Sequence, residues 1–78
     1  MKFKNVETEI ERCEYDNKWG VKITNKLVRF DKVASSGNIM NTEFVWYQYI
    51  GDSFSIKANY KTEKRMRKAM ADFGFYNI

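Results

Sequence analysis

Six cations lie close together between positions 57 and 68, and they are the side chains of this sequence best suited to binding chemistry. They are Lys57, Lys61, Lys64, Arg65, Arg67 and Lys68. Only Glu63 opposes them, so the segment has a net charge of +5. Cations at this density contact phosphates or acidic protein surfaces. The alternative, with equal weight, is an ordinary charged helix face that keeps a small domain in solution.

Aromatic residues supply a second kind of contact chemistry. The segment Glu43–Tyr49 is β-branched and aromatic on both of its faces, which is typical of a central strand or of a strand that presents aromatic rings to a partner. Trp46 and Tyr47 are neighbours on such a strand, so they point to opposite faces. We therefore expect one of the two to contact a partner, either by stacking on bases or by packing on a protein.

An acidic segment precedes these elements. Between positions 7 and 16 only Arg12 opposes five carboxylates, which gives a net charge of −4; they are Glu7, Glu9, Glu11, Glu14 and Asp16. Val6–Glu11 alternates with a period of two, so the pattern predicts a strand with its first three carboxylates on one face. Such a row could imitate the phosphates of a nucleic acid, pair with the basic helix of a second copy, or protect an edge strand from aggregation.

Several classes of catalytic chemistry have no residues to support them. The chain has no histidine and one cysteine, Cys13, which excludes Ser-His and Cys-His nucleophile pairs, an internal disulfide and a histidine-containing zinc site. Carboxylates at alternate strand positions lie about 6.6 to 7 Å apart, too far to chelate one ion without further ligands. No glycine-rich phosphate loop is present. We therefore expect a protein that is not an enzyme and that uses no metal and no cofactor.

Length and composition predict a single domain over residues 1–78. The formal net charge of +4 and the isoelectric point near 9.3 favour an anionic partner. No segment has the roughly 18 apolar residues that span a bilayer, and residues 1–5 lack the apolar centre of a signal peptide. We expect a soluble, cytoplasmic protein without a membrane partner. At this size the core either suffices alone or is completed by a second subunit, so a homodimer is possible.

The clearest element is an amphipathic helix over residues 61–75. Its apolar stripe at i, i+3, i+4 and i+7 consists of Met66, Ala69, Met70 and Phe73. Thr62 or Asn59 is a suitable N-cap, and Gly74 is placed to end the helix with a left-handed residue. Lys64, Arg65, Arg67 and Lys68 lie in its first half, where the helix dipole disfavours cations. This conflict with a local rule is often a sign of a binding site.

Strand patterns occupy the rest of the chain. Alternation predicts a hairpin from the strand at Val6–Glu11 and Trp19–Thr24, with Trp19, Val21 and Ile23 on one side. Asn25-Lys26 is either a second tight turn or part of one long strand. In Ser53–Tyr60 the alternation predicts one buried side, formed by Phe54, Ile56, Ala58 and Tyr60. The expected fold is α+β: an antiparallel sheet of four to five strands with the C-terminal helix packed on one face.

We therefore predict a small non-enzymatic binding module that occludes a macromolecular surface through its basic helix. In size, and in its Lys/Asn-rich and proline-free composition, the chain resembles the small accessory proteins of bacteriophages, many of which inhibit host machinery by binding it. The resemblance implies a host protein as the target, with nucleic-acid-handling machinery among the candidates. One alternative is direct DNA or RNA binding through the same cations and exposed aromatic residues. A second is nucleic-acid mimicry by the acidic segment.

Overall fold

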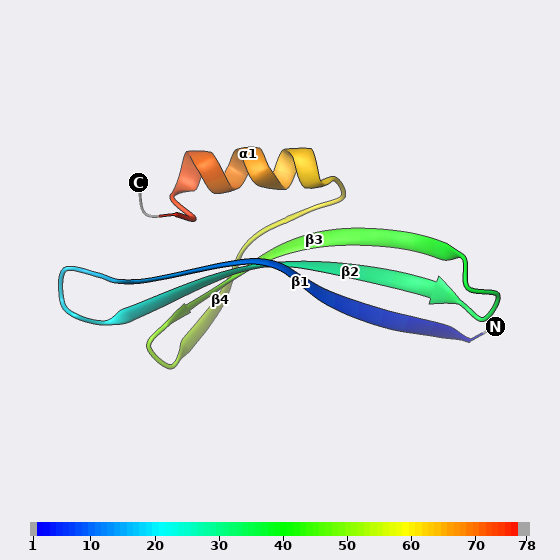
Figure 1. The fold of residues 1–78 in the computed structure, drawn as a ribbon, viewed down its shortest axis with the longest axis horizontal. Coiled ribbons are helices and arrows are strands. Elements are labelled where there is room, and N and C mark those ends of the chain that lie inside the picture. Colours follow the sequence, from blue (N-terminus) through cyan, green and yellow to red (C-terminus); the bar gives the residue numbers. More distant parts are fainter. Residues whose placement is uncertain (1, 77–78) are drawn as a thin grey trace.

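The computed structural model describes residues 2–76, so the two ends of the predicted domain, residues 1 and 77–78, lie outside the described part. Four strands precede one helix (Figure 1). They are β1 (Phe3–Asp16), β2 (Lys22–Ala34), β3 (Ile39–Ile50), β4 (Ser53–Tyr60) and α1 (Glu63–Phe73). The strands pair in the order β1-β2-β3-β4, and every pair is antiparallel. The predicted α+β fold with a C-terminal helix is confirmed.

Tight turns connect the strands where the sequence has turn residues. Gly20, Gly37 and Gly51 lie in the three connections and have positive φ values, which glycine adopts without steric cost. Asn17 shapes the first turn, since its side-chain oxygen accepts hydrogen bonds from the backbone N–H groups of Trp19 and Val21. Asn25-Lys26 is not a turn: β2 runs through it without a break. Its neighbours β1 and β3 also pair with this stretch, which keeps it extended.

The helix begins and ends at the predicted caps. The Thr62 hydroxyl accepts a hydrogen bond from the backbone N–H of Arg65, and Glu63 places a negative charge in the first turn. Gly74 adopts the left-handed conformation at φ 82°, and its N–H donates to the carbonyl of Met70. The N–H of Phe75 also donates to that carbonyl, at 2.9 Å. These bonds turn the chain back toward the sheet, so Phe75 enters the core.

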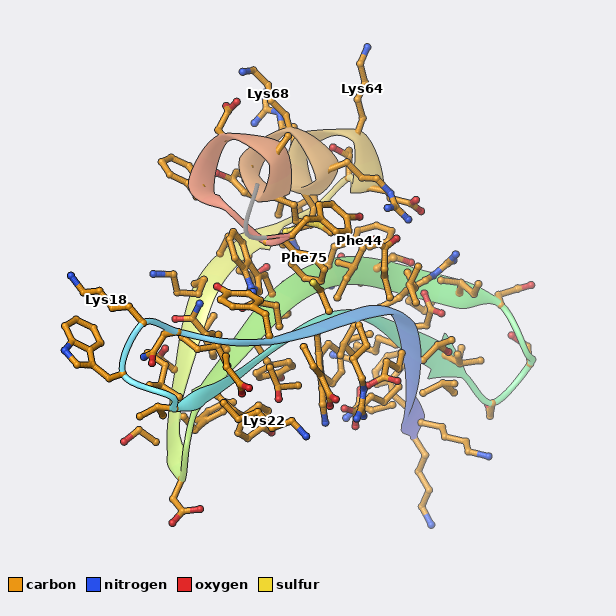
Figure 2. All side chains as sticks on the ribbon, turned by 60° about the vertical axis from the view of Figure 1, so that its left-hand side comes forward. Lys18, Lys22, Phe44, Lys64, Lys68 and Phe75 are labelled. Atoms are coloured by element: carbon orange, nitrogen blue, oxygen red, sulfur yellow. The ribbon has the colours of Figure 1, made fainter. Side chains whose placement is uncertain are left out.

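The core lies between α1 and one face of the sheet, which we call the helix face. Its buried side chains come from β2, β3, α1 and the turn that follows the helix: Leu27, Phe44, Trp46, Met66, Met70 and Phe75. Phe44 and Phe75 point into this space in Figure 2. The rings of Trp46 and Phe75 meet edge to face, with their centroids 5.4 Å apart. Half-buried Cys13 packs against the same cluster from β1.

One polar side chain is buried among these apolar groups. Asn25 is fully buried, and its amide oxygen accepts hydrogen bonds from Trp46 Nε1 and Gln48 Nε2, both at 3.0 Å. Its amide nitrogen donates to the carbonyl of Phe75 at 2.8 Å. Asn25 therefore joins β2, β3 and the chain beyond the helix in one satisfied network, which offsets the cost of burying an amide.

A bulge in β4 overturns one predicted face. The register shifts between Trp46 and Tyr47: Trp46 lies opposite Ala58, whereas Tyr47 lies opposite Ile56, which leaves Lys57 as the extra residue. Ala58 and Tyr60 therefore face the helix as predicted. Phe54 and Ile56 instead lie on the other side of the sheet, which we call the open face, and they are 52% and 56% exposed. The prediction that they are buried was wrong because a one-residue shift reverses the side-chain direction.

The first hairpin also differs from its predicted pattern. Trp19, Val21 and Ile23 were expected on one side of a strand, but β2 begins at Lys22. Trp19 lies in the turn and is 76% exposed, while Ile23 is buried.

Within residues 2–76, no helix has the length and apolar character needed to cross a membrane.

Candidate binding surface beside the helix

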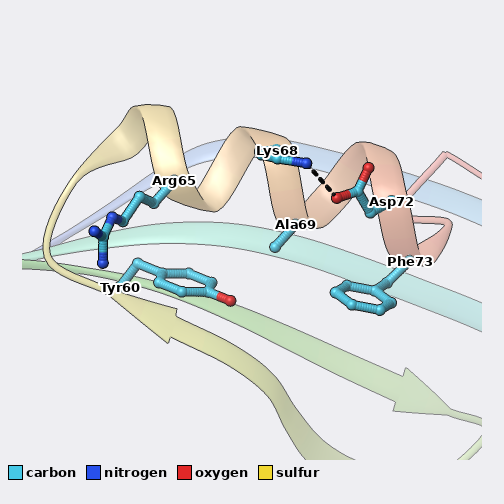
Figure 3. A pocket seen from close by; sticks show the side chains of 6 residues that line it. All are labelled: Tyr60, Arg65, Lys68, Ala69, Asp72 and Phe73. Atoms are coloured by element: carbon cyan, nitrogen blue, oxygen red, sulfur yellow. Dashed lines mark hydrogen bonds and ion pairs between the residues drawn. The ribbon is translucent and has the colours of Figure 1, made fainter.

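The predicted cations do not form one continuous ridge. Lys64 and Lys68 project from the outer side of α1, away from the sheet (Figure 2). Arg67 turns toward β1, where it contacts Glu11. Arg65 points to the opposite side of the helix and lines a groove beside Tyr60 (Figure 3). The helical period of 3.6 residues spreads consecutive positions around the axis, so these four side chains point in three directions.

Intramolecular carboxylates pair with half of the six predicted cations. Arg67 Nη1 lies 2.7 Å from Glu11 Oε1, and its Nε lies 3.0 Å from Glu63 Oε2. These hydrogen bonds, with Glu11 making the larger contribution, raise the pKa of the Arg67 guanidinium. Arg67 is thus held between its own helix and β1. The two carboxylates lower the positive potential around Arg67, which weakens its attraction for an anionic partner.

Lys68 and Lys61 are the other two paired cations. Lys68 Nζ lies 2.9 Å from Asp72 Oδ2, one helical turn away, and this hydrogen bond raises the pKa of the lysine. Lys61 Nζ lies 3.1 Å from Glu43 Oε1 on β3. All of these groups remain partly exposed, so the pairs exchange readily with water and contribute little to stability.

Three cations of the set make no ion pair among the described residues: Lys57, Lys64 and Arg65. All three are exposed. They lie on different parts of the surface, at the bulge of β4, on the outer side of α1 and in the groove. Of these three cations, Arg65 is the one that lines a concave apolar surface.

The groove runs between α1 and the end of β4, and its volume is about 280 Å³. Six residues line it: Tyr60, Arg65, Lys68, Ala69, Asp72 and Phe73. Figure 3 shows the rings of Tyr60 and Phe73 on either side of the Ala69 methyl group, with Arg65 at one end. The Lys68–Asp72 ion pair forms the outer lip. The groove therefore has an apolar floor, a neutralised rim and one free cation.

Phe73 was predicted to complete the buried stripe of the helix, and this prediction was wrong. Its side chain is 71% exposed, whereas Met66, Ala69 and Met70 are buried as expected. The reason is the turn at Gly74, which brings Phe75 into the core position beside Trp46. Phe73 is then left at the end of the groove. The helical period assigns Phe73 to the core, whereas the left-handed stop at Gly74 is the sequence signal that returns Phe75 to the apolar side of the helix.

The two predicted contact aromatics lie on opposite faces, as expected. Trp46 is 1% exposed and donates its indole N–H to Asn25, so it belongs to the core and the prediction that it is a contact residue was wrong. Tyr47 lies on the open face, half-buried, where its ring stacks on Phe54 at a centroid distance of 5.2 Å. Desolvation, with smaller effects of Glu7 and Tyr49, raises the pKa of its hydroxyl.

The acidic segment does not form one row. A register shift between Glu9 and Glu11 places Glu11 opposite Leu27 on the helix face, whereas Glu9 lies opposite Val28 on the open face. The prediction of three carboxylates on one face was therefore wrong. Glu11 binds Arg67 and accepts a hydrogen bond from the hydroxyl of Tyr76. The Glu11 carboxylate is therefore engaged by two groups of the same chain, Arg67 and Tyr76.

The acidic groups on the open face are paired as well. Arg12 lies within 3.4 Å of both Glu9 and Glu14, and Lys22 lies 3.3 Å from Glu14. Of the five predicted acidic residues, only Glu7 and Asp16 make no ion pair within the described chain. A mimic of evenly spaced phosphates requires a row of unpaired charges, so this arrangement gives that alternative little support.

Among residues 2–76, no group of three or more carboxylate or thiol side chains is close enough to hold a metal ion. Comparison of the chain with protein-family models, with curated proteins and with solved structures finds no significant match.

Proposed function

We propose that this chain is a non-enzymatic protein-binding module that occludes its target through the groove between α1 and β4. The observation that carries the proposal is the combination of exposed Phe73, the Tyr60 ring and Ala69 methyl group beside it, and the unpaired Arg65. Aromatic and arginine side chains in concave sites supply most of the binding energy of protein interfaces. The groove has both residue types and little competing charge.

The chemistry of the groove defines the segment that it accepts. Its floor fits one large apolar side chain, and burying such a side chain contributes roughly 1.5 to 3 kcal/mol. Arg65 at one end favours a carboxylate close to that side chain, because a guanidinium binds carboxylates in a bidentate manner. We therefore propose a partner segment with an aromatic or aliphatic residue beside an acidic group.

A protein is a better partner for this surface than a nucleic acid. Three of the six predicted cations, namely Lys61, Arg67 and Lys68, already pair with the chain's own carboxylates. Electrostatic binding to phosphates depends on the number of cations that are available to neutralise them. The compositional resemblance to bacteriophage accessory proteins supports a host protein as our proposed target, with nucleic-acid-handling machinery among the candidates.

The test is affinity capture from a host lysate treated with nuclease, using the full chain and three single variants. We expect the wild-type chain to retain a specific protein, and Phe73→Glu and Arg65→Glu to lose it, because each removes one half of the groove chemistry. Lys18→Glu, on the distant first turn, is the matched charge-reversal control and should retain it. Equal capture by all four chains would exclude the groove as the contact surface.

Direct binding of DNA or RNA is the second candidate, and the unpaired Lys57, Lys64 and Arg65 favour it. An electrophoretic shift assay with single- and double-stranded DNA and RNA at low salt tests this candidate. Binding would weaken with salt with a log-log slope of about 0.7 to 0.9 per phosphate contacted, and Lys64→Glu would weaken it further. The absence of any complex at low salt would exclude this function.

A further inference from the structure

The open face of the sheet carries an aromatic cluster that no element of the described chain covers. Phe54 contacts two tyrosines, with centroid distances of 5.2 Å to both Tyr47 and Tyr49, and Phe30 meets Tyr47 edge to face at 6.1 Å. Ile56 lies opposite Tyr47 on the neighbouring strand. Phe54 and Ile56 are 52% and 56% exposed. We call Phe30, Tyr47, Tyr49, Phe54 and Ile56 the open-face cluster.

The chain is less compact than a typical domain of its length, so it has surface available for a covering partner. The radius of gyration is 14.5 Å, whereas a compact domain of this length has a value of about 11.5 Å. The accessible surface is 5633 Å², against roughly 5,000 Å² for a compact monomer of 9.3 kDa. The excess approaches the roughly 800 Å² that each partner buries in a standard interface.

The thickness of the molecule leads to the same conclusion. The principal extents are 49 × 25 × 15 Å, and the helix lies over one side of the sheet only (Figure 1). A sheet with one covered face normally presents polar side chains on the other. Here β3 and β4 place aromatic and aliphatic side chains on both faces, which is the pattern of a sheet packed between two layers.

The charge pattern of the open face favours a second copy of the chain over a strongly charged partner. Its cations and carboxylates are interspersed: Arg12, Lys22 and Lys26 lie within 4.0 Å of Glu9 or Glu14. A face of this kind does not attract a strongly charged ligand such as a nucleic acid, and it does not repel an identical face. Because each face carries both cations and carboxylates, the cations of one copy can lie opposite the carboxylates of the other in a two-fold arrangement.

We propose that two copies of the chain pack their open faces together around a two-fold axis, with the open-face cluster at the centre of the interface. The two sheets then lie about 10 Å apart, as in a sandwich, and the two helices lie on the outside. This inference goes beyond the proposed function and does not depend on it. The dimer leaves both grooves beside α1 accessible, so one particle presents two target-binding sites.

Sedimentation equilibrium of the purified full chain over a range of concentrations tests the dimer. We expect the wild type to be a dimer, and the double variant Phe54→Lys, Ile56→Lys to be a monomer with an unchanged far-ultraviolet circular dichroism spectrum. Both substituted side chains are already half exposed, so the fold of the protomer tolerates the change. Phe73→Glu, which introduces a charge at the groove, is the matched control and should remain a dimer.

If the double variant does not fold, the milder variant Phe54→Ala tests the same interface. It removes the ring that contacts both tyrosines, and we expect the dissociation constant of the dimer to rise by about tenfold or more. A monomeric wild type would overturn the proposal and leave the face to a different partner. A dimer that persists unchanged in the Phe54 variants, or that dissociates on Phe73→Glu, would overturn it as well.

Discussion

At the scale of single residues, Asn25 is the side chain on which most of the core geometry depends. Its amide makes three hydrogen bonds to groups that lie 21, 23 and 50 positions away in the sequence. An apolar residue at this position would leave the indole N–H of Trp46 and the carbonyl of Phe75 without partners. The buried amide therefore favours one packing of β2, β3 and the C-terminal turn over alternative packings that would bury a similar apolar area.

We expect Asn25→Ala to lower the free energy of unfolding by about 2 to 4 kcal/mol, because it leaves two buried polar groups unsatisfied and creates a small cavity. Urea unfolding monitored by circular dichroism measures the change. Asn5→Ala, at an exposed position of β1, is the control and should change stability by less than about 0.5 kcal/mol. A loss below about 1 kcal/mol for Asn25→Ala would show that water replaces the amide without cost.

At the scale of elements, the end of α1 determines which phenylalanine is buried. Gly74 turns the chain with a left-handed conformation, and this turn places Phe75 in the core and Phe73 in the groove. A Cβ atom at position 74 would meet no atom within 4 Å. Any cost of a side chain at this position is therefore conformational and not steric.

We expect Gly74→Ala to destabilise the protein by about 1 kcal/mol, because alanine disfavours the left-handed region by roughly 1 to 2 kcal/mol and gains part of this back from the unfolded chain. Gly74→Asn should cost less, since asparagine adopts this conformation more readily. Thermal unfolding of the two variants beside the wild type gives the comparison. An alanine variant as stable as the wild type would mean that the turn relaxes to another conformation.

At the scale of the whole molecule, the two tryptophans report on two different environments. Trp46 is buried between the sheet and the helix, whereas Trp19 is 76% exposed on the first turn, with Lys18 Nζ 4.5 Å from its ring centroid. Their positions follow from the layered arrangement, because the hairpin of β1 and β2 extends beyond the part of the sheet that the helix covers (Figure 1).

We expect the Trp19→Phe variant to retain only blue-shifted fluorescence that resists quenching by acrylamide, since water does not reach the remaining indole. Trp46→Phe should show the reverse, with emission at longer wavelength and efficient quenching. Steady-state fluorescence and Stern–Volmer slopes measure both. Similar slopes for the two variants would contradict the burial of Trp46. Because Trp19 lies outside the core, Trp19→Phe should leave the unfolding midpoint nearly unchanged.

The amino-acid sequence by itself determined the local features of this protein. The helix, its caps at Thr62 and Gly74, the turns and most strands follow from neighbouring residues, whose periodicity and backbone preferences act over a few positions. The composition likewise excluded histidine-based catalysis without reference to a fold.

Only the tertiary structure decided which side chains share a surface. The bulge in β1 moves Glu11 to the helix face, and the bulge in β4 moves Phe54 and Ile56 to the open face. Each shift depends on cross-strand partners that are distant in sequence, and one extra residue reverses the side-chain direction on one side of the bulge relative to the other. The pairing of Arg67 with Glu11 has the same origin. Local patterns therefore predict the elements, while the binding surfaces depend on how those elements are aligned.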